Sequence, residues 1–206
     1  MQLVFLKLLI RKEGVIYHGG LLRFFHGFRV KETLQAKYHF PVAALNDGKA
    51  AALAELATGH LKGVTNGAAL VLGSGLGGGI IINGKLFQGS HFQAGELTFL
   101  LPLQMEKLDP SLMQETTLSA IGLITKVNEI LASLDLKDGL LAFKAINAKK
   151  EAVYPIFETY CRNLAITILN LQTIFDMETF VLGGGISAQS ILIEEVNRQF
   201  DKVHHE

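Results

Sequence analysis

The chain has 206 residues, 49% of them hydrophobic, and it carries 19 basic and 19 acidic side chains. This composition supports a buried core, whereas the balanced charge, with no run of Lys and Arg, argues against nucleic acid or an anionic membrane surface as a partner. A single cysteine, Cys161, excludes an intramolecular disulfide framework and a zinc site with several thiolates, and no apolar stretch reaches the roughly 20 residues that span a bilayer, so we expect a cytoplasmic protein with small-molecule partners.

The sequence of the first part of the chain predicts two units, each a strand followed by a helix. GVIYHGG predicts a strand that enters a turn, and the apolar residues one turn apart in VKETLQAKY predict an amphipathic helix. A short apolar strand follows Pro41, and the alanine-rich segment GKAAALAELATG predicts a helix that ends at Gly59. Asn46 and Asp47 lie at the junction of this second strand and helix.

The middle of the chain predicts a β-meander. GAALVLG and GIIING are two apolar strands, and Asn83-Gly84 indicates a type I′ hairpin that leads into KLFQG. Downstream, Ser111 and Gln114 predict a capping box for a helix that runs through Leu118, Ile121 and Ile124.

The last third of the chain predicts a long helix, a strand and a final helix. Apolar residues at spacings of three and four predict the long helix from about Ala148. TFVLGGGIS then repeats the pattern of a strand that enters glycines. A final helix is expected to run through Ile191, Ile193, Val196 and Phe200.

Five of the seven residues from Gly73 to Gly79 are glycine. A glycine-rich turn can bring backbone N–H groups against a phosphate, but glycines also serve a tight hairpin that requires positive φ. A strand follows the glycines here, which excludes a dinucleotide fingerprint, and no Gly-Lys-Ser/Thr closes a P-loop. The glycines alone do not distinguish phosphate binding from a plain hairpin, and the two are equally consistent with them.

Three acidic residues are candidates for a site, and each also has an ordinary structural explanation. Asp47 can act as a general base, although its spacing favours an N-cap of the following helix. Glu96 can accept hydrogen bonds from hydroxyls, or it is a solvated loop residue. Glu115 lies in a predicted first helical turn, where the helix dipole favours negative charge.

Four segments, taken together with their order and spacing, decide between these alternatives. They are VAALNDGKAAALAE, GAALVLGSGLGGGIIINGKLFQG, QAGEL and FVLGGGIS. In combination they resemble the sugar kinases of the ROK family (repressor, open reading frame, kinase), over about residues 14–203. The resemblance implies an α/β protein with the two-lobed, actin-like ATPase (ribonuclease H-like) fold.

The resemblance also implies roles for individual residues. Asp47 would take the proton from the 6-hydroxyl of a hexose as this hydroxyl attacks the γ-phosphate of ATP, with Mg²⁺ arriving on the nucleotide. Asn46, Glu96 and Glu115 would bind the sugar. The residues that would line the ATP phosphates and adenosine are Gly73, Ser74, Gly75, Gly77, Gly78, Gly183, Gly184 and Gly185. A homodimer is expected, with no nucleic acid or membrane as partner.

The sequence departs from the family pattern in two places. Phe99 stands where the family pattern has a histidine that contacts sugar and zinc, and the cysteines of that site are missing, so no structural zinc is expected. A β-glucoside or another substituted hexose becomes a candidate substrate. The Asp-Gly-Gly-Thr-like first phosphate motif has no counterpart before Gly14, and few residues follow Gly185, so we expect a chain truncated at both ends.

The truncation shapes the expected domain organisation. Within one partial kinase domain over 1–206, residues of about 14–45 would be a remnant of an incomplete N-terminal lobe, and those of about 46–206 would hold the sugar and nucleotide region. We expect the truncation to impair phosphorylation by this chain. Two alternatives to a kinase remain, a sugar-binding remnant without catalysis and a sugar-responsive regulator.

Overall fold

The computed structural model describes residues 3–5, 9–10, 13–17, 23–100 and 117–205, and all statements below refer to them. The strands are β1 (Leu3–Phe5), β2 (Leu9–Ile10), β3 (Ile16–Tyr17), β4 (Ala44–Asn46), β5 (Gly67–Leu72), β6 (Leu76–Ile82), β7 (Lys85–Phe87) and β8 (Thr179–Gly184). The helices are α1 (Val30–Tyr38), α2 (Asp47–Thr58), α4 (Ala120–Ile130), α5 (Gly139–Asn147), α6 (Tyr154–Phe175) and α7 (Ser190–His205), with short 3₁₀ turns η1 (Arg23–Phe25) and η2 (Leu97–Phe99).

The central element is a sheet in the order β7-β6-β5-β8. β5, β6 and β7 form the predicted antiparallel meander, and β8 joins β5 in parallel. Asn83 and Gly84 both have positive φ (52° and 67°), as a type I′ hairpin requires, so this part of the prediction is confirmed. In the described part of the chain, β1 pairs with β4 in parallel and β2 pairs with β3 in antiparallel orientation, each as a separate small sheet.

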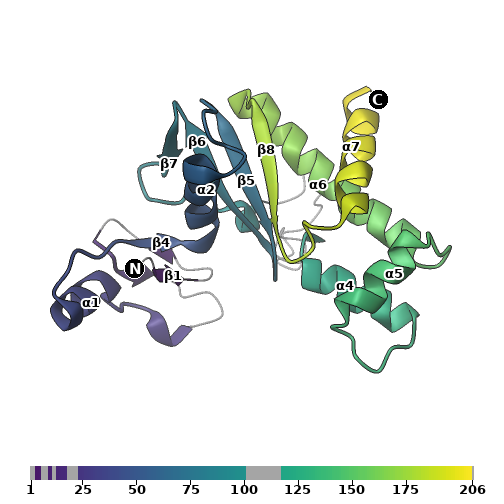
Figure 1. Ribbon diagram of the computed structural model, residues 1–206, viewed down its shortest axis with the longest axis horizontal. Helices are drawn as coiled ribbons and strands as arrows, with labels where there is room; N and C mark the ends of the chain where they lie inside the picture. The colour runs from purple at the N-terminus through teal and green to yellow at the C-terminus, as the bar shows by residue number, and fades with distance from the viewer. Residues whose placement is uncertain (1–2, 6–8, 11–12, 18–22, 101–116, 206) are drawn as a thin grey trace, which may run out of the picture.

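Helices cover both faces of the central sheet (Figure 1). Because side chains alternate along β5, Leu70 and Leu72 enter the large core beneath α4, α5, α6 and α7, whereas Ala69 faces the opposite side. On that side Ala52 of α2 packs with Ala69 and Ile81 in a smaller core. This packing therefore fixes the position of α2 relative to the β5–β6 hairpin.

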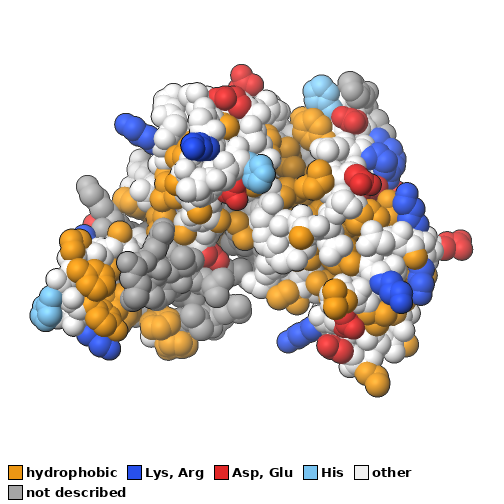
Figure 2. Space-filling view, in the orientation of Figure 1, with side chains coloured by type: hydrophobic (Ala, Val, Ile, Leu, Met, Phe, Trp, Pro, Cys, Tyr) orange, Lys and Arg blue, Asp and Glu red, His pale blue; other side chains and the backbone are white. Residues whose placement is uncertain are grey.

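The region around α1 has a much smaller core, in which Ile16 and Val30 are buried. Part of its surface is apolar, as the patch of hydrophobic side chains at the α1 end of the molecule in Figure 2 shows. The exposed aromatic residues of this region are Phe24, Phe28, Tyr38 and Phe40. Among the described helices, none is long and apolar enough to cross a membrane.

Several predicted boundaries were wrong. The helix expected through Leu118 begins at Ala120, because the Ser119 hydroxyl caps it by accepting from the Gly122 N–H at 2.9 Å. The long helix begins at Tyr154 and not near Ala148, because Lys149 turns the chain with a left-handed φ of 49°. Helix α5 was missed, and the expected capping box at residues 111–114 lies outside the described residues.

One other detail of the prediction also differs from the structure. The glycine-rich turn is shorter than expected, because β6 already begins at Leu76 and takes in the last three glycines. The predicted final helix is found as α7, on which Ile191 and Val196 are buried and Ile193 is 42% exposed.

Candidate active site

The N-terminus of α2 is capped by Asn46, the last residue of β4. Its side-chain Oδ1 accepts hydrogen bonds from the backbone N–H groups of Gly48 (2.8 Å) and Lys49 (3.3 Å). Asp47 is the first helical residue and is only partly buried, and its Oδ1 also accepts from the Gly48 N–H at 3.0 Å. The N-cap alternative for Asp47 is therefore wrong, and its carboxylate is not needed to cap the helix.

Glu96 lies beside this helix terminus although it is distant in sequence. The Asn46 side-chain Nδ2 donates to Glu96 Oε2 at 3.3 Å. The amide of Asn46 thus links the helix cap to the carboxylate, and three of the four residues expected at the sugar and the catalytic step lie together. Glu115, the fourth, lies outside the described residues.

Two glycines of β6 make this arrangement possible. A Cβ on Gly78 would lie 2.6 Å from the Leu97 side chain and 2.9 Å from the Gly95 carbonyl, and one on Gly79 would lie 2.5 Å from the Ala52 Cβ. These glycines let α2 and the turn before η2 approach the sheet closely. Gly78 therefore has a packing reason to be glycine that does not depend on a ligand.

Lys49 was not identified as a candidate from the sequence. It is 2% exposed, its Nζ lies 3.0 Å from Glu96 Oε1, and it donates to the Phe92 carbonyl. A signal for it was available, because the helix dipole disfavours a cation in the first turn of a helix. A lysine in the first turn of an otherwise alanine-rich helix indicates a charged partner elsewhere in the fold.

The electrostatics of Glu96 reflect its burial. Burial raises the pKa of its carboxyl above the ordinary glutamate range, the Lys49 ammonium opposes this increase in part, and the negative charge of Asp47 adds to it. Glu96 Oε1 accepts no hydrogen bond of regular geometry from the described residues, although Lys49 lies beside it. A carboxylate has about four acceptor sites, so that of Glu96 keeps unused ones, although Oε1 itself is buried beside Lys49.

A second set of glycines lies where the β5–β6 turn meets the end of β8. The parallel register pairs Leu72 with Gly184, and Leu72 also pairs with Leu76, so the two glycine segments are adjacent. The Gly73 N–H donates to the Gly75 carbonyl at 3.0 Å and closes the turn. Both segments were expected to contact ATP, and the fold brings them to one edge of the sheet.

The glycines of these two segments differ in what surrounds them. Gly184 has a φ of 102°, which only glycine adopts readily, and a Cβ there would lie 2.1 Å from the Leu72 carbonyl oxygen. By contrast, a Cβ on Gly73 or Gly185 would meet nothing within 4 Å, and one on Gly77 would make an ordinary contact of 3.5 Å. These three positions have no packing or conformational reason to be glycine, which fits a surface that a ligand approaches.

The chain matches a known protein family over most of its length. The model of the ROK family matches residues 8–205. The chain belongs to the ROK family. A β-glucoside kinase of Listeria innocua is 31% identical over 191 residues, which cover 90% of this chain and 64% of that ROK protein. The chain thus spans less than two thirds of this relative's length.

Two solved ROK structures extend the match to the fold. The Lmo2764 protein from Listeria monocytogenes superposes with a TM-score of 0.83 at 27% identity, over 95% of this chain and 68% of that one. A ROK family protein from Streptococcus pneumoniae, solved in complex with sucrose, superposes with a TM-score of 0.79 at 30% identity, over 95% of this chain and 66% of that one. The expected α/β fold of the actin-like ATPase class is confirmed.

Proposed function

We propose that the protein phosphorylates a hexose at its 6-hydroxyl with ATP. The observation that carries this proposal is the meeting of Asn46, Asp47 and Glu96 at the N-terminus of α2, since the family resemblance assigns all three to the sugar and the proton transfer. The names of the relatives as kinases support the same reaction. The β-glucoside kinases among them, together with Phe99 in place of the family histidine, favour a β-glucoside among the candidate substrates.

In this proposal each side chain has one role. Asn46 and Glu96 orient the sugar by hydrogen bonds to its hydroxyls, and Glu115 is a third sugar contact. Asp47 takes the proton of the sugar's 6-hydroxyl while the oxygen of that hydroxyl bonds to the γ-phosphorus of ATP. The bond from this phosphorus to the β,γ-bridging oxygen breaks at the same time, and ADP leaves. The partly exposed Asp47 carboxylate, which the helix does not need as a cap, suits this role.

The nucleotide fits the glycine-lined edge between the β5–β6 turn and the end of β8. The space around Gly73, Gly77 and Gly185 admits a phosphate or sugar close to the backbone, and Ser74 is exposed beside them. Gly75, Gly78, Gly183 and Gly184 would shape the same edge. Mg²⁺ bound to ATP would neutralise charge on the phosphates.

The decisive experiment is a coupled kinase assay with glucose, mannose, fructose, N-acetylmannosamine and a β-glucoside, followed by Asp47→Asn. We expect this variant to lose at least about 100-fold in kcat with little change in sugar affinity, because asparagine lacks the carboxylate that acts as the base but has nearly the same side-chain shape as aspartate. Asp201→Asn, at an exposed position of α7, is the matched control and should keep wild-type kcat. More than a tenth of wild-type kcat in Asp47→Asn would contradict the proposal.

The nucleotide part is tested separately with glycine variants. Gly73→Ala, Gly77→Ala and Gly185→Ala should weaken ATP binding and leave thermal stability unchanged, because a methyl group at position 73 or 185 enters open space in the free protein and one at position 77 makes only an ordinary contact of 3.5 Å. Gly79→Ala is the contrasting control, and it should lower the melting temperature because of the contact with Ala52. If all three alanine variants bound ATP as tightly as the wild type does, the nucleotide would not bind at this edge.

The proposal includes a cytoplasmic location, where ATP is available, and assembly as a homodimer. Apolar side chains that α4 and α5 expose to solvent support self-association, among them Ile121 (48% exposed), Ile130 (46%) and Leu140 (85%). Light scattering measures the mass in solution. A monomer at micromolar concentration would contradict the dimer and leave the kinase proposal standing.

A further inference from the structure

Lys49 occupies a position that is costly for a lysine. Its side chain is 3% exposed, and burial of an ammonium group is strongly unfavourable unless the charge is paired. It also lies in the first turn of α2, where the partial positive charge of the helix repels a cation. Alanines follow it at positions 50–52, so the helix itself has no need of a long charged side chain here.

The partners of Lys49 explain why the cost is tolerated. Its Nζ lies 3.0 Å from Glu96 Oε1 and donates to the carbonyl of Phe92. Phe92 has a φ of 60°, a left-handed conformation that is rare for an aromatic residue. Such a conformation persists only where surrounding contacts enforce it. Lys49 thus contacts both the Glu96 carboxylate and Phe92, a strained position in the segment that precedes Glu96.

We propose that Lys49 is a positioning residue of the sugar site, which orients the Glu96 carboxylate and the backbone at Phe92 so that Glu96 can accept hydrogen bonds from the hydroxyls of the hexose. The inference rests on the proposed function and adds a residue to it. Asn46 holds Oε2 from the helix cap, and Lys49 holds Oε1 from the first turn of the same helix, so both oxygens of the carboxylate are fixed. The Glu96 side chain is 13% exposed, and its Oε1 is buried against Lys49.

The charges around Glu96 give Lys49 a second effect. The groups that influence it are Lys49 and Asp47, both on α2, whereas β6 and η2, which pack against the same turn, carry no titratable side chain. Burial and Asp47 both raise the pKa of Glu96, and Lys49 lowers it. Without Lys49 the carboxyl stays protonated to a higher pH, and a protonated carboxyl is a poorer acceptor for a hydroxyl.

The test compares Lys49→Met, Lys49→Arg and the matched control Lys62→Met, which removes an exposed lysine beyond the other end of α2. Calorimetry measures hexose affinity from pH 5 to pH 8, and ¹³C NMR follows the Glu96 carboxyl in the free protein, assigned with Glu96→Gln. We expect Lys49→Met to weaken hexose binding about tenfold or more at neutral pH and to move the Glu96 titration to higher pH. Lys49→Arg should keep the titration near that of the wild type, and Lys62→Met should change neither reading.

A double-mutant cycle separates positioning from a general structural role. In the Glu96→Gln background, Lys49→Met should cause no further shift in the pH profile of binding. If Lys49→Met does not fold, Lys49→Gln gives the same readings, because it removes the charge and keeps a donor for the Phe92 carbonyl.

The outcomes distinguish the two proposals. A wild-type protein that binds no hexose contradicts the proposed function, and with it the sugar role of Lys49. A wild-type protein that binds hexose, together with a folded Lys49→Met that binds equally well and titrates alike, overturns the role of Lys49 alone.

Discussion

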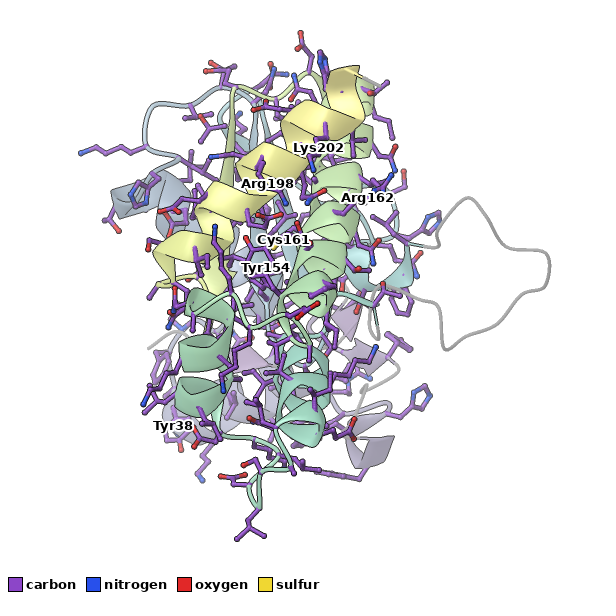
Figure 3. The ribbon with its side chains drawn as sticks, turned by 90° about the vertical axis from the view of Figure 1, so that its right-hand side faces the viewer. Tyr38, Tyr154, Cys161, Arg162, Arg198 and Lys202 are labelled. Carbon is purple, nitrogen blue, oxygen red and sulfur yellow. The ribbon has the colours of Figure 1, made fainter. Side chains whose placement is uncertain are left out.

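Glu96 and Glu195 are both largely buried beside a cation, yet their surroundings differ. Glu195 lies between α6 and α7 and accepts hydrogen bonds from Tyr154 Oη (2.9 Å), Arg198 Nε (2.9 Å) and Gln199 Nε2 (2.6 Å). Figure 3 shows Tyr154 and Arg198 where these two helices meet. Glu96 accepts one hydrogen bond from Asn46, and its other oxygen has only the ion pair with Lys49.

The pKa directions follow from this difference. Burial raises the pKa of both carboxyls, but the bonds from Arg198, Gln199 and Tyr154 outweigh burial at Glu195, so its pKa lies below the ordinary range. At Glu96 the single lysine does not outweigh burial, and the pKa is raised. A carboxylate whose acceptor sites are filled by the protein stabilises the fold, whereas one left partly unfilled is available to a ligand.

The largest expected effect is on ligand binding at Glu96. Glu96→Gln should weaken hexose binding about 10- to 100-fold, because a hydrogen bond to a charged acceptor is replaced by one to a neutral amide. Calorimetry measures the affinity, and urea denaturation measures the stability. If the variant lost stability but kept wild-type affinity, Glu96 would belong with Glu195 as a structural residue.

The next effect is on stability at Glu195. Glu195→Gln should lower the free energy of unfolding by about 1 to 3 kcal/mol, because Arg198 and Tyr154 lose their charged acceptor. Glu194→Gln, an exposed neighbour on α7, is the matched control and should change little. Hexose affinity should stay at the wild-type value in both variants, and a selective loss of affinity in Glu195→Gln would break the comparison.

A smaller effect separates the two carboxyls by pH. Because the folded pKa of Glu195 is lowered, its stabilising contribution is present above the unfolded value of about 4.3 and is lost as the pH falls below it. The free energy of unfolding should therefore decrease below about pH 4.3, and this decrease should be shallower in Glu195→Gln. Urea titrations at several pH values test it, and equal slopes in the two proteins would show that Glu195 is not the group responsible.

The smallest effect concerns one donor to Glu195. Burial, reinforced by the hydrogen bond to Glu195, raises the pKa of Tyr154 to about 12, so its hydroxyl remains a donor at neutral pH. Tyr154→Phe should cost about 1 kcal/mol of unfolding free energy. Tyr38→Phe, at a position 44% exposed on α1, should cost nothing measurable. Equal costs would mean that the bond to Glu195 contributes no stability.

The local elements of the fold were readable from the sequence. Residues 83–84 form the predicted hairpin, and Gly59 ends α2, because backbone conformation at these positions depends on the residues themselves. The strands before and after the glycines were found in the same way, from apolar runs bounded by turn residues. Asn46, Asp47 and Glu96 were identified by resemblance, since the residue patterns alone favoured an ordinary structural explanation for Asp47 and for Glu96.

The tertiary structure decided what depends on contacts between distant segments. That Asn46 and not Asp47 caps α2 depends on backbone angles at the strand end, and that Asn46 bonds Glu96 depends on the packing of α2 against β6. The burial of Lys49 could not be read from α2 alone, because its partners lie more than 40 residues away. Likewise the sequence shows glycines at positions 73 and 79 as equals, and only the folded chain separates a glycine that faces open space from one that admits a helix, because the difference lies in the atoms that surround each Cα.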